Sequence, residues 1–220
     1  MKKNLTEMVF ILDRSGSMSN LTDDTIGGFN SMIENQKAEE GEAYVTTVLF
    51  DDQYDLLHDH VNVKEIEPIT RKEYFARGCT ALLDAVGKTI NSVGERLHNT
   101  PEEERPEKVI FVITTDGYEN ASKEFNKTKI KEMIEHQQDK YSWVFMFLGA
   151  NMDAVSEAAS YGIKADFSKT YTASAQGTSS VYGSVTSAMS ALRSIDLSEV
   201  NCLCEAKAYA DAISTLDSIV

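Results

Sequence analysis

The sequence has few cysteines and no long apolar run. Three of its 220 residues are cysteines, Cys79, Cys202 and Cys204. So small and odd a set does not build a disulfide framework, which favours a reducing compartment. No histidine cluster lies near these cysteines in the sequence, so no zinc site is predicted. No stretch approaches the roughly 20 apolar residues of a membrane helix, and the run after Met1-Lys2-Lys3 is too short for a signal peptide. The sequence therefore predicts a cytoplasmic protein without a membrane segment.

Positive charge is also scarce. Lysine and arginine number 21 against 35 aspartate and glutamate residues, which gives a formal net charge of -14. Such a surface repels nucleic acid, so a nucleic-acid-binding function is excluded, and in the simplest interpretation the charge only keeps the protein soluble. An acidic partner is repelled as well, unless a bound cation locally reverses the sign of the surface.

The chain contains a regular alternation of short apolar runs and helical patterns. Strands are predicted over 8–12, 43–50, 54–63, 109–114 and 143–148, with a last edge strand over 165–167. Helices are predicted over 22–38, 80–97, 128–138, 153–161 and 176–194. A short turn at Asp51-Asp52-Gln53 makes one strand pair antiparallel. The alternation predicts a Rossmann-like, doubly wound α/β fold, with a mostly parallel central sheet, one antiparallel edge strand and helices on both faces.

The predicted organisation is one domain over residues 1–195 followed by a C-terminal extension over 196–220. An apolar stripe at helical spacing predicts a helix in the extension: Val200, Leu203, Ala206, Ala210, Ile213 and Leu216. That helix packs on the domain or is offered to another protein. The small, polar residues of 170–180 predict a loop before the last helix of the domain.

Oxygen-bearing side chains occur at the ends of two predicted strands and at the start of one helix. Asp13-Arg14-Ser15-Gly16-Ser17 follows the first strand, Thr115-Asp116-Gly117 follows the strand over 109–114, and Gly78-Cys79-Thr80 opens a helix. In a parallel sheet these segments meet at the carboxyl edge, where ligands bind. Two carboxylates and three hydroxyls are hard oxygen donors. Such donors suit Mg²⁺, with Mn²⁺ close behind and Ca²⁺ as a further alternative.

The order Asp13-x-Ser15-x-Ser17, then Thr80, then Asp116 resembles the metal-ion-dependent adhesion site of von Willebrand factor A domains and integrin inserted domains. The resemblance implies that Ser15 and Ser17 bind the ion directly, and that Thr80 binds it directly when a ligand is present and through water otherwise. It implies that Asp13 and Asp116 hold coordinating waters or bind the ion themselves. It also implies that an aspartate or glutamate of a protein partner completes the coordination.

Each piece of this pattern has an ordinary structural explanation when taken alone. Aspartate, serine and threonine are common helix N-caps, which applies to Asp13, Ser15 and Thr80, and Asp116-Gly117 suits a turn. Three pieces in the right order and context, over a resemblance that spans most of the chain, favour the metal site.

The predicted function is a divalent-metal-dependent protein–protein interaction module rather than an enzyme. One alternative is a scaffold subunit with an incidental metal. Bacterial stand-alone A-type domains, which often work beside AAA+ ATPases, metal chelatases or stress-resistance systems, resemble this chain in size. The other alternative is a Mg²⁺-dependent phosphatase-like hydrolase of the haloacid dehalogenase type, but Ser15 stands where that pattern needs a second acid.

Overall fold

The fold is built on one six-stranded sheet. The computed structural model describes residues 1–195. The strands lie in the order β3-β2-β1-β4-β5-β6. Their bounds are β1 (Lys2–Asp13), β2 (Glu42–Phe50), β3 (Tyr54–Asn62), β4 (Pro106–Thr115), β5 (Val144–Ala150) and β6 (Ser168–Tyr171). Only β3 runs antiparallel to its neighbour, and this confirms the predicted mostly parallel sheet with one antiparallel edge strand.

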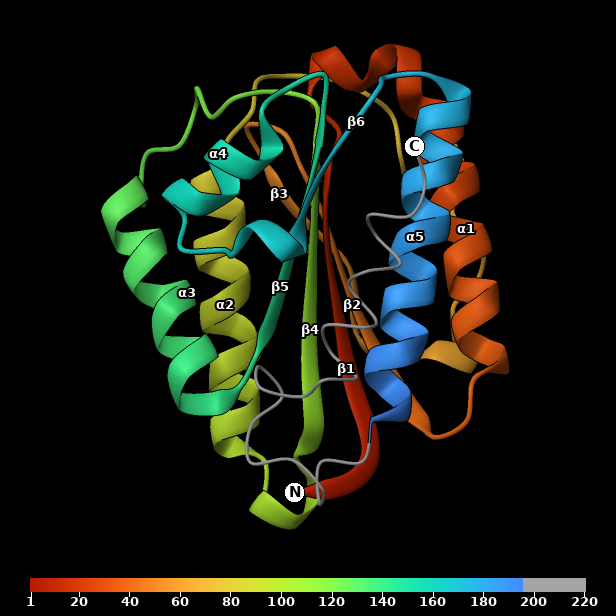
Figure 1. Ribbon diagram of the computed structural model, residues 1–220, viewed down its shortest axis with the longest axis vertical. Helices are drawn as coiled ribbons and strands as arrows, with labels where there is room; N and C mark the ends of the chain where they lie inside the picture. Colours follow the sequence, from red (N-terminus) through yellow and green to blue (C-terminus); the bar gives the residue numbers. More distant parts are fainter. Residues whose placement is uncertain (196–220) are drawn as a thin grey trace.

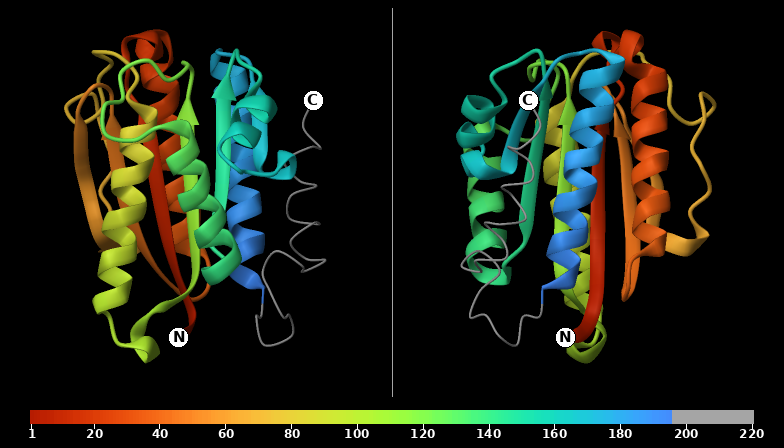
Figure 2. Two further views of the ribbon diagram at one scale, coloured as in Figure 1. Left: turned by 90° about the vertical axis from the view of Figure 1, so that its left-hand side faces the viewer. Right: turned by 45° about the vertical axis from the view of Figure 1, so that its right-hand side comes forward.

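Helices cover both faces of the sheet, as the alternating pattern predicts. Their bounds are α1 (Thr22–Ala38), α2 (Leu82–Asn99), α3 (Lys127–Tyr141), α4 (Ala154–Ser160) and α5 (Ala175–Ser194). Figure 1 shows α1 and α5 on one face and α2, α3 and α4 on the other. In both views of Figure 2 the sheet lies between these two layers. The central strands are therefore buried on both sides, which is why Met8 to Leu12 form an unbroken apolar run with no exposed surface.

The order of the strands reverses at β1. Its two neighbours are β2 on one side and β4 on the other, so the chain leaves β1 in one direction and later returns to its opposite edge. At such a switch the connecting segments diverge and leave a crevice at the carboxyl ends of the strands, where ligands bind in this class of fold. The Asp13 end of β1 and the Thr115 end of β4 meet at this point.

Two local predictions are wrong. The edge strand expected over 165–167 is a single 3-10 turn, η4 (Ala165–Phe167), and the strand begins at Ser168, where pairing with β5 becomes available. The loop expected over 170–180 shrinks to residues 172–174, because β6 runs to Tyr171 and α5 begins at Ala175. The Ser174 side chain caps α5 by accepting a hydrogen bond from the Gly177 N–H.

None of the helices within residues 1–195 has the length and apolar character needed to cross a membrane. The predicted extension over 196–220, together with Cys202 and Cys204, lies outside the described residues.

Candidate metal centre

The five predicted ligands come from three segments that the fold brings to the carboxyl edge. Asp13 is the last residue of β1, and Asp116 directly follows β4. The two strands are neighbours in register, with Leu12 opposite Thr114, so Asp13 and Asp116 emerge at the same edge of the sheet, Asp116 one residue further along. Ser15 and Ser17 follow in the turn into η1 (Gly16–Leu21), and Thr80 precedes α2.

The hydroxyl groups of this cluster face one another and the second carboxylate. Ser15 Oγ lies 3.0 Å from Ser17 Oγ. Ser17 Oγ in turn donates a hydrogen bond to Asp116 Oδ1. A Cβ placed on Gly117 would lie 3.2 Å from Thr80 Oγ1 and 3.5 Å from Ser17 Oγ. Thr80 and Ser17 therefore present their hydroxyls to the same backbone position beside Asp116, and all three predicted segments contribute to one cluster.

Asp13 is held rigidly at the base of the cluster. Its side chain is fully buried. Its Oδ1 accepts a hydrogen bond of 2.6 Å from the Ser15 N–H, and its Oδ2 accepts one of 2.5 Å from Thr115 Oγ1. Burial raises the pKa of Asp13 to about 6, against the lowering effect of the Thr115 and Ser15 hydrogen bonds and with a smaller contribution from the charge of Asp116. A nearby cation would offset the cost of keeping this carboxylate ionised.

Asp116 is only partly exposed, and burial raises its pKa too, while the hydrogen bond from Ser17 lowers it. The two carboxyl groups are thus both shielded from water, fully at Asp13 and partly at Asp116. Two neighbouring carboxylates are stabilised most by a positive charge between or beside them.

The loop between β3 and α2 holds the Asp13–Ser17 segment in place. Tyr74 Oη donates a hydrogen bond to the Asp13 carbonyl. The Arg77 N–H donates to the Arg14 carbonyl at 2.8 Å, and the Gly16 N–H donates to the Gly78 carbonyl at 3.1 Å. Gly78 has φ +67 and sits against Asp52, where a side chain would be strained. These backbone bonds fix the distance between the two serines and Thr80.

Thr80 is held in place by hydrogen bonds to the loop after β4 rather than by the start of a helix. It does not start the helix, since α2 begins at Leu82 with Ala81 as its N-cap. Its N–H donates to Asn120 Oδ1 at 3.0 Å, and its carbonyl accepts from the N–H groups of Asn120 and Ala121. The N-cap alternative also fails for Ser15, which precedes η1 but makes no side-chain capping bond. The hydroxyls of Ser15 and Thr80 are therefore not used as caps.

Sequence reasoning missed three residues that support the cluster: Thr115, Tyr74 and Asn120. Thr115 has a signal in the sequence, because a hydroxyl at the end of a buried strand needs a partner and Asp13 ends the adjacent strand. Tyr74 and Asn120 have no such signal in the sequence, since they reach the cluster through loops whose path depends on the whole fold.

The donor set is suited to a hard cation. It consists of carboxylate and hydroxyl oxygens, and residues 1–195 contain no group of three or more histidine, cysteine, aspartate or glutamate side chains placed to hold a metal ion. Thiolate and imidazole sites for softer metals are therefore absent from the described part of the chain, while oxygen ligands are those that Mg²⁺ and Mn²⁺ take.

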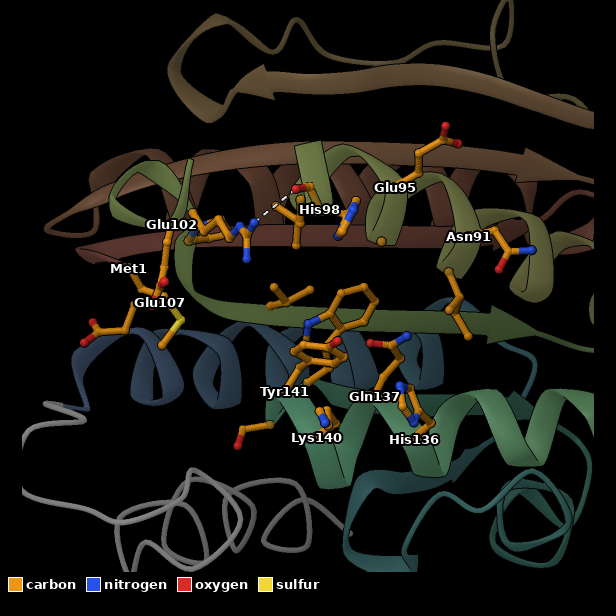
Figure 3. Close-up of a pocket in the computed structure, with 18 residues that line it drawn as sticks. Met1, Asn91, Glu95, His98, Glu102, Glu107, His136, Gln137, Lys140 and Tyr141 are labelled. Carbon is orange, nitrogen blue, oxygen red and sulfur yellow. Dashed lines mark hydrogen bonds between the residues drawn. The ribbon is translucent and has the colours of Figure 1, made fainter. Parts of the chain in front are cut away.

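A cavity of about 750 Å³ lies at the opposite edge of the sheet, between α2 and α3. Figure 3 shows that His98, His136, Lys140 and Tyr141 line it, together with several carboxylates and Met1 at the N-terminus. None of the five predicted ligands borders it.

Comparison with solved structures identifies the fold. Proximal thread matrix protein 1 from the mussel byssus, in a structure with a zinc-occupied MIDAS motif, superposes with a TM-score of 0.57 at 18% identity, over 84% of this chain and 46% of that one. A von Willebrand factor type A protein from Catenulispora acidiphila gives a TM-score of 0.57 at 13% identity, over 84% and 42%. The chain has a von Willebrand factor A-type fold.

Another structure with the A-type fold is the manganese-loaded TRAP protein of Plasmodium vivax. It superposes with a TM-score of 0.56 at 15% identity, over 78% of this chain and 70% of that one. The present chain spans less than half the length of the mussel and Catenulispora proteins. No protein-family model and no curated protein sequence matches it.

Proposed function

We propose that this A-type domain binds a divalent cation through Asp13, Ser15, Ser17, Thr80 and Asp116, and that the ion then binds a carboxylate of a protein partner. The observation that carries the proposal is the oxygen cluster itself. Two serine hydroxyls 3.0 Å apart, one of them bonded to Asp116, lie next to Thr80 and above a buried Asp13.

The two carboxylates support the proposal through their charge. They balance the charge of a divalent cation without exceeding it, so an acidic ligand from outside can still join the coordination. Neighbours with the same fold have a zinc-occupied MIDAS motif or are manganese-loaded, which supports a divalent ion at this edge and leaves its identity open to measurement. We propose Mg²⁺ as the working ion, with Mn²⁺ as its close substitute.

The acidic surface supports the interaction role. With a net charge of -14 the chain as a whole repels an acidic partner, and a bound cation would reverse the sign of the surface locally. A partner carboxylate would thus be directed to one place. We propose a non-catalytic role, because the hydroxyls and carboxylates of the cluster are hydrogen-bonded to one another and none of the five predicted ligands is a histidine or cysteine.

Titration calorimetry with Mg²⁺ and Mn²⁺ tests the metal site. We expect saturable binding by the unaltered protein and loss of at least tenfold in affinity for Asp116→Ala and Ser15→Ala, with circular dichroism spectra unchanged because both side chains lie at the edge of the fold. Normal metal binding by Asp116→Ala would contradict the assignment.

Capture of partners with Mg²⁺ and with EDTA then separates the remaining functions. An interaction module loses its partner in EDTA, whereas a scaffold with an incidental metal keeps it. A hydrolase would turn over a generic phosphoester with Mg²⁺, and such turnover, abolished by Asp13→Asn, would replace the interaction role.

A further inference from the structure

An exposed aromatic ring stands beside the predicted metal centre. Residues 1–195 contain three aromatic side chains among their exposed large apolar residues, Phe75, Tyr118 and Tyr141. Two of these three lie in loops of the site: Tyr118 is two residues after Asp116, and Phe75 is in the loop that holds the Asp13–Ser17 segment. Phe75 leaves 41% of its surface exposed. Exposed aromatic residues at such a place are typical of binding surfaces.

Phe75 is held in place by two arginines. The guanidinium carbons of Arg14 and Arg77 lie 5.4 and 5.2 Å from the centre of the ring, within the range of cation–π contacts. Arg14 is buried, and it occupies the position between Asp13 and Ser15 in the predicted metal motif. The residue that supports the ring is thus part of the same backbone segment as the serine ligands.

The two arginines are themselves fixed by carboxylates. Arg77 Nε lies 2.6 Å from Asp51 Oδ2, and Arg14 Nε lies 3.4 Å from the same atom, which is fully buried. Both arginines also pair with Asp55. Their positive charge is therefore largely balanced, and the ring is a pre-ordered apolar surface rather than a cationic one. A partner side chain that packs on it loses little of its binding energy to ordering the protein.

Phe75 lies close in the chain to a residue that contacts the predicted metal site. It is three residues from Gly78, whose carbonyl bonds Gly16 between the two serine ligands. Three residues span at most about 10 Å. An extended partner segment covers the same distance in about three residues, so a close neighbour of a carboxylate on the ion can reach the Phe75 ring.

We infer that the partner segment carries an apolar side chain within about three residues of its acidic residue, and that this side chain packs on Phe75. The inference rests on the proposed function and adds to it the chemistry of the second contact.

Short synthetic peptides test this inference by nuclear magnetic resonance titration of the Mg²⁺-loaded protein. One peptide has a single glutamate flanked only by glycine. Each of the others replaces one of these glycines with phenylalanine, at one, two or three residues before or after the glutamate. We expect at least one phenylalanine peptide to bind about five- to tenfold more tightly than the glycine peptide. Phe75→Ala should reduce this advantage to less than twofold, and Phe75→Leu should keep part of it.

Tyr141→Ala is the matched control, because Tyr141 is also an exposed aromatic residue, 57% exposed against 41% for Phe75, but borders the cavity at the other edge of the sheet (Figure 3). It should leave the preference unchanged. Mn²⁺ affinity, measured in parallel, should be the same in Phe75→Ala as in the unaltered protein. If the glycine peptide binds in a metal-dependent way and no phenylalanine peptide binds better, the inference is wrong and the proposed function stands. If Mn²⁺ binds but no peptide does, the metal site stands, and both recognition of a partner carboxylate by the ion and the present inference are wrong.

Discussion

At the scale of single residues, the cluster depends on a threonine that binds no ion in the predicted scheme. Thr115 Oγ1 donates to Asp13 Oδ2 at 2.5 Å and accepts from the Gly117 N–H at 3.1 Å. It therefore fixes both the buried carboxylate and the turn that carries Asp116. Residues that orient metal ligands in this way commonly contribute 10- to 100-fold to metal affinity.

We predict that Thr115→Val lowers Mn²⁺ affinity by about tenfold or more while the protein stays folded, because valine keeps the shape but leaves Asp13 Oδ2 without its donor. Calorimetry gives the affinity and urea denaturation the stability. Thr47→Val is the control, since Thr47 is equally buried but its hydroxyl has no hydrogen-bond partner among the described residues. It should leave Mn²⁺ affinity unchanged, and equal losses in the two variants would refute a specific role for Thr115.

We predict that His58, which lies on β3 opposite Thr47, makes the stability of the fold depend on pH. Burial lowers its pKa below the ordinary 6.5. The unfolded chain therefore takes up a proton at a higher pH than the folded one, so the contribution of His58 to stability is lost as pH falls below about 6.5. The free energy of unfolding of His58→Gln, subtracted from that of the unaltered protein between pH 7.5 and 5, isolates this effect. A difference that stays flat across this range would contradict the prediction.

At the scale of secondary-structure elements, α1 and α5 pack closely through a glycine. Gly28 of α1 faces the Tyr182 ring of α5 so closely that a Cβ there would lie 2.3 Å from a ring carbon. Tyr182 is buried against the sheet and cannot move outward without uncovering the core. The small residue at this position therefore sets the distance between the two helices that cover one face of the sheet (Figure 2).

We predict that Gly28→Ala destabilises the fold by about 1–3 kcal/mol, as overpacking does in a tight core. Gly27→Ala, one position away, should stabilise it by about 0.5–1 kcal/mol, because no atom lies within 4 Å of the added Cβ and alanine is the better helix former. Urea denaturation of the two variants decides the matter. If both substitutions stabilise, the close packing of α1 on α5 is not as described.

At the scale of the whole molecule, the fold keeps two carboxyl groups partly or fully buried at one edge, with raised pKa values. A cation bound there would favour the folded state, because it binds the assembled cluster and not the unfolded chain. The three segments of the site lie 63 residues apart between Ser17 and Thr80 and 36 apart between Thr80 and Asp116. Only the folded sheet brings them together, so the unfolded chain has no comparable site.

We therefore predict that Mg²⁺ or Mn²⁺ at 100 times its dissociation constant stabilises the domain by about 2.7 kcal/mol, and that EDTA reverses the gain. Thermal unfolding followed by circular dichroism measures the shift. At the same ion concentration Ser15→Ala and Asp116→Ala, with affinity at least tenfold weaker, should show no more than about half of the shift, while Phe75→Ala should show the full shift. An equal shift in all variants would mean that the ion binds elsewhere.

The sequence by itself determined the class of fold and pointed to the residues of the candidate site. Runs such as Met8 to Leu12 are apolar at every position because both faces of their strand are covered, and that requirement is visible in the residues alone. The ligand types are visible too, since Asp13, Ser15, Ser17, Thr80 and Asp116 follow or precede the predicted elements directly in the chain. Local sequence carries this information because strand ends and hydroxyl spacing are local properties.

The tertiary structure decided what depends on contacts between distant segments. The last edge strand begins at Ser168 rather than at Ala165, because only there does the chain meet a free edge of β5. Thr80 is positioned by Asn120, and the Phe75 ring is held by Arg14 and Arg77. Such pairings arise when loops from separate elements meet at one edge of the sheet, and their partners have no fixed spacing in the chain from which they could be predicted.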